Sequence, residues 1–237
     1  MQILFTLRPE IFSILIMLLL IIYDRYCARF RNERDEYLRF ALVCLAHCIM
    51  ALVTEITVNL DTVPKTVNDV CHVMFFLFSL LYSGFYLEYA LKQVLPKGKR
   101  RRQIMGVGNV LILAAIVIMV FSPIYYLQGE NTRYSAGIGP TLCFALGFIF
   151  IVGADVILVI CRKRVNDTVL MMLLPLSTIT MGLLVMQICI PEFLCTAQAL
   201  TLTAVGMFFV VENPVSRFRS QAFIDHNTQV EPQRLRV

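Results

Sequence analysis

Residues 193–211 read Phe193-Leu-Cys-Thr-Ala-Gln-Ala-Leu-Thr-Leu-Thr-Ala-Val-Gly-Met-Phe-Phe-Val-Val211, an apolar run broken only by small or neutral polar side chains. Glu212-Asn213-Pro214 follows, and the chain then turns basic with Arg217 and Arg219. An apolar helix of about 20 residues is what is needed to cross the hydrocarbon layer of a bilayer. The run therefore predicts a helix, called here the exit helix, that leaves a membrane and continues into a short polar tail.

The rest of the chain is built from similar runs. Of its 237 residues, 58% are hydrophobic and 16% charged, with a mean hydropathy of +0.74, which is too apolar for a soluble domain of this length. Apolar runs cover residues 9–26, 40–60, 70–91, 105–127, 138–161, 168–190 and 193–211. We expect an all-α, seven-helix transmembrane bundle over residues 1–213 and a short cytoplasmic tail over 214–237.

The distribution of Lys and Arg predicts the orientation, because cytoplasmic loops carry an excess of both. The segments after the first, third and fifth runs, together with the tail, hold 18 of the 21 basic residues: Arg25, Arg29, Arg31, Arg34, Arg39, Lys92, Lys97, Lys99, Arg100, Arg101, Arg102, Arg162, Lys163, Arg164, Arg217, Arg219, Arg234 and Arg236. The other side holds Arg8, Lys65 and Arg133. The N-terminus is therefore expected outside and the C-terminus in the cytoplasm of a multi-pass inner-membrane protein.

Two receptor classes are excluded by the positions of their signatures. Asp24-Arg25-Tyr26 resembles a triplet of rhodopsin-like G-protein-coupled receptors, but it ends the first run instead of the third, and the chain has no Trp. A retinal protein needs a Lys in its last helix, and the five Lys residues all lie in or beside loops. The basic residues border membrane segments, so no nucleic-acid partner is expected.

Polar side chains at one depth suggest a site. Counting along the helices places Glu55, His72, Gln187 and Gln198 at similar levels toward the outside. Such groups are costly in contact with lipid and normally face a polar interior. We expect them to surround a pocket for a small ligand entering from outside. The alternatives are that they only tie helices together and that Glu55 extends toward the outer interface.

Other polar groups have simpler interpretations. Cys44, His47 and Cys48 share a helical face, which favours a packing surface over a soft-metal site. Glu88 is one turn from Lys92 and should pair with it. Asp155 is expected to pair with a neighbouring loop Arg such as Arg162.

Three cysteines are expected toward the outer face of the membrane, where an oxidising compartment would permit a disulfide bond between two of them. These residues are Cys71, Cys189 and Cys195. Whether such a bond forms is left open.

In the sixth run, Pro175 interrupts the backbone hydrogen bonding of a helix and Gly182 follows two turns later. We expect Pro175, Gly182 and Pro214 to form a relay that moves the exit helix.

Pro175, Gly182 and Gln187, the aromatic run 75–82 and the Tyr- and Gly-containing turn 128–137 together resemble the membrane sensor segments that precede GGDEF diguanylate cyclase domains in bacteria. A related group precedes histidine kinases. Such cyclase domains open with Asp-x-Leu-Thr-Gly-Leu-x-Asn-Arg. The tail keeps three of these positions, as Asp225, Thr228 and Val230, and lacks the first Leu, the Gly, the Asn and the Arg.

This resemblance implies a sensory input module that passes a signal to a cytoplasmic output domain absent from this chain. The chain itself has no phosphate loop, zinc hydrolase motif or nucleophile elbow, so no enzyme activity and no cofactor are expected. Val215, Phe218 and Ala222 have a 3–4 spacing suited to a homodimer continuing from the exit helix. A small seven-helix transporter and a membrane scaffold protein are the alternatives.

Overall fold

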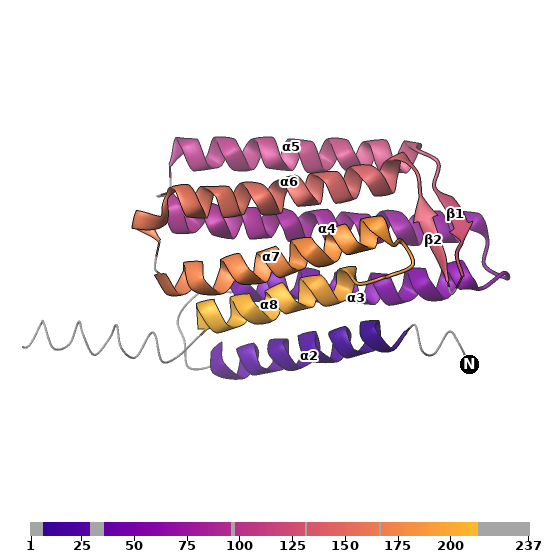
Figure 1. Ribbon diagram of the computed structural model, residues 1–237, viewed down its shortest axis with the longest axis horizontal. Coiled ribbons are helices and arrows are strands. Elements are labelled where there is room, and N and C mark those ends of the chain that lie inside the picture. The colour runs from indigo at the N-terminus through magenta and orange to yellow at the C-terminus, as the bar shows by residue number, and fades with distance from the viewer. Residues whose placement is uncertain (1–6, 29–35, 96–97, 131, 166, 213–237) are drawn as a thin grey trace, which may run out of the picture.

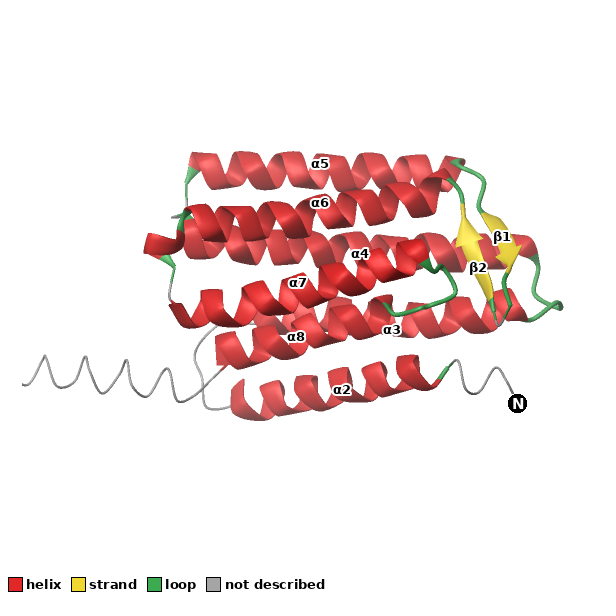
Figure 2. Cartoon of the chain, viewed as in Figure 1, coloured by secondary structure: helices red, strands yellow, loops and turns green. Residues whose placement is uncertain are grey.

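The computed structural model describes residues 7–28, 36–95, 98–130, 132–165 and 167–212. These ranges form seven α-helices, one short 3-10 helix and a two-stranded hairpin (Figures 1 and 2). The elements are α2 (Arg8–Ala28), α3 (Glu36–Asn59), α4 (Lys65–Val94), α5 (Lys99–Phe121), β1 (Tyr125–Gln128), β2 (Arg133–Ala136), α6 (Ile138–Ile160), η1 (Arg162–Arg164), α7 (Asp167–Cys189) and α8 (Thr196–Glu212). The prediction of a helical bundle is confirmed.

Five of these helices are long and apolar enough to cross a membrane, which indicates a membrane protein. They are Tyr37–Asn59, Lys65–Val94, Lys99–Phe121, Ile138–Ile160 and Val169–Cys189. The exit helix is shorter than the predicted 193–211, because residues 190–195 form a turn in which the Phe193 N–H donates to the Ile190 carbonyl at 2.9 Å. At 1.5 Å per residue, the 17 residues of α8 extend about 26 Å, slightly less than the hydrocarbon thickness.

Successive helices run in opposite directions, so the bundle has two distinct ends (Figure 1). The hairpin end carries β1, β2 and the turns 60–64 and 190–195. The opposite end, called the basic end, carries the described basic residues of the first, third and fifth connections: Arg25, Arg39, Lys92, 99–102 and 162–164. Arg8, Lys65 and Arg133 lie at the hairpin end. The bundle thus separates the basic residues as the alternation of the apolar runs predicts.

The helices form a closed ring in the order α2, α3, α4, α6, α7 and α8, and α5 packs outside against α4 and α6. Helix α8 also contacts α3 across the ring. Small residues allow this close approach: Ala197, Ala199 and Ala204 of α8 are buried. The exit helix is therefore also a central helix of the bundle.

The hairpin replaces part of a predicted helix. The apolar run 105–127 was expected to be helical throughout, but α5 ends at Phe121 and Tyr125–Gln128 is a strand that pairs antiparallel with Arg133–Ala136. Pro123, which cannot continue a helix, lies in the break. Gly137 leads back into α6 with a φ of 128°, a conformation that favours glycine.

Candidate functional site

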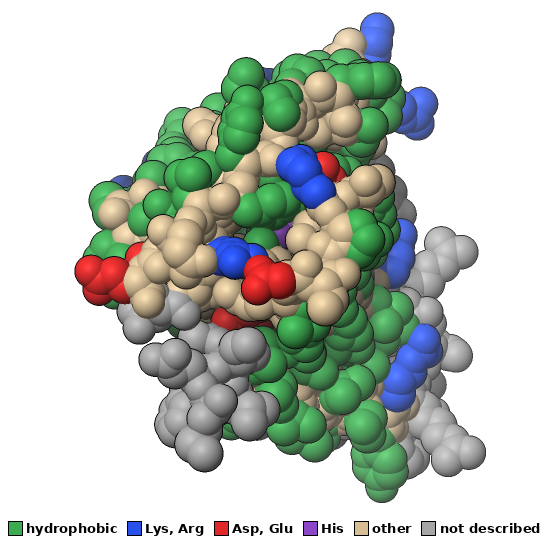
Figure 3. All heavy atoms as spheres, turned by 90° about the vertical axis from the view of Figure 1, so that its right-hand side faces the viewer, with side chains coloured by type: hydrophobic (Ala, Val, Ile, Leu, Met, Phe, Trp, Pro, Cys, Tyr) green, Lys and Arg blue, Asp and Glu red, His purple; other side chains and the backbone are tan. Residues whose placement is uncertain are grey.

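A cavity of about 90 Å³ opens at the hairpin end of the bundle. Figure 3 views this end and shows a hollow with a histidine at the bottom and charged side chains at its rim. The polar residues that line the cavity are Glu10, Thr54, Glu55, His72, Arg133, Ser135, Gln187 and Thr196, and the aromatic ones are Phe75, Phe76, Tyr134 and Phe144. Helices α2, α3, α4, α6, α7 and α8 and strand β2 all contribute to the lining.

Three of the four residues predicted from depth line this one cavity. They are Glu55, His72 and Gln187, and all three are buried, with 4% of Glu55 exposed. Gln198 lines a neighbouring cavity of about 330 Å³ that shares Glu55 and Leu194 with the first. Glu55 therefore faces the polar interior and does not extend to the surface. That these residues bind a ligand stays a prediction.

Glu10 is the lining residue that the sequence analysis missed. It lies in the first turn of α2 and is 2% exposed. Its Oε1 accepts a hydrogen bond from Gln198 Nε2 at 3.2 Å, whereas its Oε2 has no hydrogen-bond partner among the described residues. The signal was a carboxylate at the very start of the first apolar run, at the same level as the other four groups. Its pairing with Gln198 of α8, 188 residues away in the sequence, cannot be predicted from depth alone.

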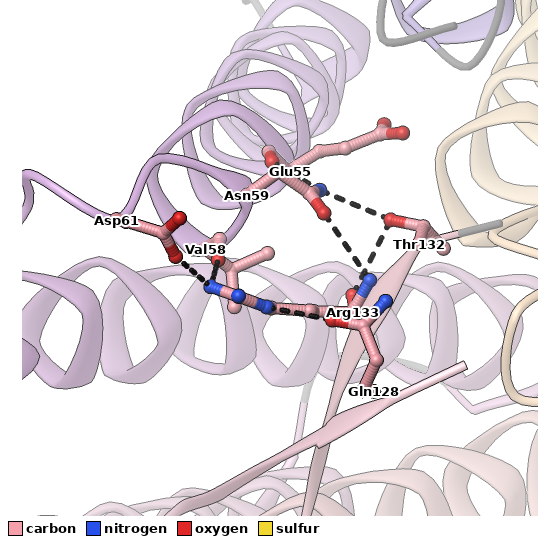
Figure 4. Close-up of polar contacts among 7 residues, drawn as sticks. All are labelled: Glu55, Val58, Asn59, Asp61, Gln128, Thr132 and Arg133. Carbon is pink, nitrogen blue, oxygen red and sulfur yellow. Dashed lines mark hydrogen bonds and ion pairs between the residues drawn. The ribbon is translucent and has the colours of Figure 1, made fainter. Parts of the chain in front are cut away.

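The hairpin is fixed over the cavity by α3 (Figure 4). Arg133 Nη1 donates to Asp61 Oδ1 at 2.8 Å and to the Val58 carbonyl at 3.3 Å, and its Nε donates to Gln128 Oε1 at 2.9 Å. Asn59 adds two contacts, since its Nδ2 donates to Thr132 Oγ1 at 3.0 Å and its Oδ1 accepts from the Arg133 N–H at 3.3 Å. The guanidinium at the rim is thus engaged by the protein itself.

On the other side the hairpin reaches α4 through Tyr126. Its hydroxyl donates to Asp69 Oδ1 at 2.8 Å, and its ring lies 5.0 Å from the ring of His72. Burial, followed by the Asp69 carboxylate, raises the pKa of the Tyr126 phenol. His72 Nδ1 is 2.9 Å from the Asn68 carbonyl, which can only accept, so Nδ1 carries the proton of this bond. The ring orientation of His72 is therefore set by its own helix.

Gln187 joins α7 to the beginning of α8. Its side-chain oxygen accepts from the Cys195 backbone N–H at 3.1 Å and from the Thr196 hydroxyl. The Cys195 thiol contacts the same oxygen at 3.8 Å and donates to the Leu183 carbonyl at 3.1 Å. The first N–H groups of a helix have no partner within it, so this glutamine side chain caps α8. A residue of the cavity lining thereby positions the start of the exit helix.

Below the cavity, α8 is held by single neutral hydrogen bonds from its neighbours. Tyr37 of α3 donates to the Ala204 carbonyl at 3.2 Å and Tyr82 of α4 to the Leu200 carbonyl at 3.0 Å. Thr180 of α7 donates to the Ala199 carbonyl at 3.1 Å. Near the basic end the Phe208 ring packs on the rings of Tyr23 and Tyr37, at 5.5 and 5.4 Å. All four neighbouring helices thus touch α8 directly.

The cysteine-rich face of α3 packs against other helices. Cys48 Sγ lies 3.4 Å from Thr201 Oγ1 of α8, whereas the His47 ring lies 4.6 Å from the ring of Phe75 on α4. Within the described residues no group of three or more His, Cys, Asp or Glu side chains is placed to hold a metal ion. The residues contact two different helices, as a packing surface does.

Two of the expected pairings can be checked. Glu88 pairs with Lys92 at 2.9 Å, as predicted. The pairing of Asp155 with Arg162 is wrong, because Asp155 Oδ1 instead accepts from the Tyr86 hydroxyl of α4 at 3.0 Å. Since Asp155 is buried inside the bundle, a partner on the adjacent helix reaches it and a loop side chain does not.

The remaining predictions concern cysteines and the relay. Cys71, Cys189 and Cys195 are free thiols, so the open question of a disulfide among them is answered in the negative. Pro175 lies inside α7 and, like Gly182, on its exposed face. Pro214 and the dimer positions Val215, Phe218 and Ala222, together with Asp225, Thr228 and Val230, lie outside the described residues.

No family model and no curated protein matches this chain.

Proposed function

We propose that this chain is the membrane-embedded sensory input module of a bacterial signal-transduction protein. In this proposal it passes a signal through α7 and α8 to a GGDEF-like cytoplasmic output domain outside the chain. The observation that carries the proposal is the course of α8. This helix begins in the lining of the hairpin-end cavity, with Thr196 and Ala197, and runs through the centre of the bundle toward the basic end.

A displacement of side chains in the cavity lining would alter the contacts of α8 directly. Gln187 lines the cavity and caps α8, so a ligand that displaces it alters the contacts of Cys195 and Thr196. Farther along, α8 is held by neutral hydrogen bonds to its backbone carbonyls and by small side chains. Such contacts are individually worth about 1 kcal/mol, which lets a helix adopt two positions at a modest cost. A shift or rotation of α8 would then change how the two chains of a homodimer pair beyond residue 212.

The packing under the cavity favours a sensor over a transporter. Phe76, Leu80, Tyr82 and Tyr86 of α4 are almost completely buried and fill the bundle between the cavity and the basic end. A transporter needs a site that opens alternately to both sides, usually near the bilayer midplane. The cavity instead lies at one end, beside the hairpin, which suits reception of a ligand without its passage.

The proposal places the hairpin end outside and the basic end in the cytoplasm. Reporter fusions after Arg102 and after Val237 should give cytoplasmic signals, and a fusion at Thr132 should give an outside signal. The reason is that this topology has 18 of the 21 basic residues on its cytoplasmic side. A reporter active only in the periplasm and one active only in the cytoplasm measure this directly. A periplasmic signal from the fusion after Val237 would overturn the orientation.

Signal transfer can be tested in the full chain fused after Val237 to a diguanylate cyclase domain. We expect the cyclic dinucleotide level to respond to the outside medium and Glu55→Gln to change that response about fivefold or more, a typical coupling between two sites. The substitution keeps the size of the side chain and removes its charge. Glu88→Gln, at the basic end, is the matched control and should respond as the unmodified chain does. An unchanged response in correctly inserted Glu55→Gln would refute the pathway through this cavity.

A further inference from the structure

We propose that a groove at the basic end of the bundle, called here the basic-end groove, binds an anionic phospholipid of the surrounding membrane. The groove lies where the ends of α4, α5 and α6 meet the short helix η1, and its volume is about 590 Å³. It is at the opposite end of the bundle from the hairpin-end cavity (Figure 1). Its role is therefore separate from the proposed sensory function.

Four basic side chains form the rim of the groove. Arg100 belongs to the first turn of α5, and Arg162, Lys163 and Arg164 make up η1. All four are exposed, and none forms an ion pair with another residue of the described ranges. The two connections that supply the rim, 95–103 and 161–166, contain eight Lys or Arg residues and no Asp or Glu. The rim therefore complements a negatively charged group.

The beginning of α5 strengthens this preference for an anion. Residues 99–102 place four basic side chains at the start of the helix, where the helix dipole disfavours positive charge. Gly98 precedes them and has no side chain that could cap the helix. A negatively charged headgroup beside Arg100 would offset both the mutual repulsion of these cations and their unfavourable position.

The wall of the groove, in contrast to its rim, is apolar. It is formed mainly by Leu91, Val94, Leu95, Ile104, Ile157 and Ile160. Leu91 and Val94 are buried, whereas Ile160 is 76% exposed. Ile104 lies five residues beyond the start of α5, which is about 7.5 Å along the helix. An apolar surface thus begins within two helical turns of the basic rim, close enough for one molecule to contact both.

A phospholipid has the same order of groups along the membrane normal. The basic side chains lie at the ends of α5 and α6, where lipid headgroups are located, and the apolar wall continues along these helices into the hydrocarbon layer. Arginine donates paired N–H groups to phosphate oxygens, and basic pockets between transmembrane helices are suited to anionic headgroups. Ligand sites have volumes of roughly 300–1,000 Å³, so the groove has room for a headgroup and the adjoining part of the acyl chains.

The experiment titrates the purified full chain, in micelles of an uncharged detergent at neutral pH, with dioleoylphosphatidylglycerol. This anionic lipid should raise the melting temperature saturably, because it binds the folded chain. Dioleoylphosphatidylcholine has the same acyl chains and no net charge, and it should not stabilise at the same mole fraction. Glycerol 3-phosphate carries the phosphate without acyl chains, and its failure to stabilise would separate a lipid site from a site for free phosphate.

Two matched double variants locate the binding site. Arg100→Gln with Arg164→Gln removes two charges from the rim, and the affinity for phosphatidylglycerol should fall at least about tenfold, because each lost bond is to a charged group. Lys99→Gln with Arg102→Gln removes the same charge from the same end, but neither residue lines the groove. This control should lose less than about threefold, since exposed charges outside the site are screened by salt. All four side chains are exposed, so both variants should fold.

Three results would overturn the proposal. The first is the absence of a saturable shift with phosphatidylglycerol. The second is an equal shift with phosphatidylcholine or with glycerol 3-phosphate, since neither combines an anionic headgroup with acyl chains. The third is an equal loss of affinity in the two double variants, which would indicate diffuse attraction to a basic surface instead of binding in the groove.

Discussion

Replacing Tyr82 with Ala should lower the free energy of unfolding by about 3–5 kcal/mol, the range for truncating a large buried aromatic side chain. Tyr82 is 1% exposed and lies at the centre of the bundle, where its ring is 4.6 Å from that of Phe40 on α3. Its hydroxyl donates to the Leu200 carbonyl of α8 at 3.0 Å. The substitution leaves a cavity where three helices meet, and denaturant-induced unfolding in mild detergent measures its cost.

Two other variants separate packing from hydrogen bonding at this position. Tyr82→Phe removes only the hydroxyl and should cost about 1 kcal/mol, the usual net value of one hydrogen bond. Tyr125→Ala on the hairpin, where the residue is 57% exposed, is the matched control and should change stability by less than about 0.5 kcal/mol. If Tyr82→Ala were as mild as Tyr125→Ala, the central packing of α8 against α4 would be refuted.

The helices were predictable because hydrophobic length is a strong signal in a chain of this kind. A run such as 138–161 is apolar throughout, and the observed helix, Ile138–Ile160, ends within one residue of it. The alternation of basic and non-basic connections likewise appears in the bundle as two distinct ends. Depth counting grouped Glu55, His72 and Gln187 correctly, because each helix residue advances by a fixed rise.

Features that depend on contacts between distant segments were not predictable. Tyr125, Tyr126 and Leu127 are as apolar as the helix before them, and only pairing with β2 makes them a strand. Asp155 pairs with Tyr86 because α4 and α6 are neighbours, a fact that no local pattern contains. The same holds for Glu10, whose hydrogen-bond partner Gln198 is 188 residues away in the sequence.

Gln187→Leu should be the other substitution with a large effect, on stability as well as on signalling. Leucine has nearly the same size but no acceptor, so the Cys195 N–H and the Thr196 hydroxyl lose their shared partner in a buried site. Leaving buried donors unsatisfied should cost about 2–4 kcal/mol. Denaturant-induced unfolding of the ligand-free full chain gives this value, and the cyclase fusion should lose its response because the start of α8 is no longer tied to the cavity.

A double-mutant cycle identifies the cause of the destabilisation by Gln187→Leu. If the orphaned Thr196 hydroxyl carries part of the cost, Thr196→Val should be less destabilising in the Gln187→Leu background than in the unmodified chain, by about 1 kcal/mol. Gln103→Leu, on the exposed surface of α5, is the matched control and should change neither stability nor the response of the fusion. Additive effects of the two substitutions would show that the hydrogen bond between Thr196 and Gln187 contributes nothing to the cost. A fusion that still responds with Leu at position 187 would show that the signal reaches α8 by another contact.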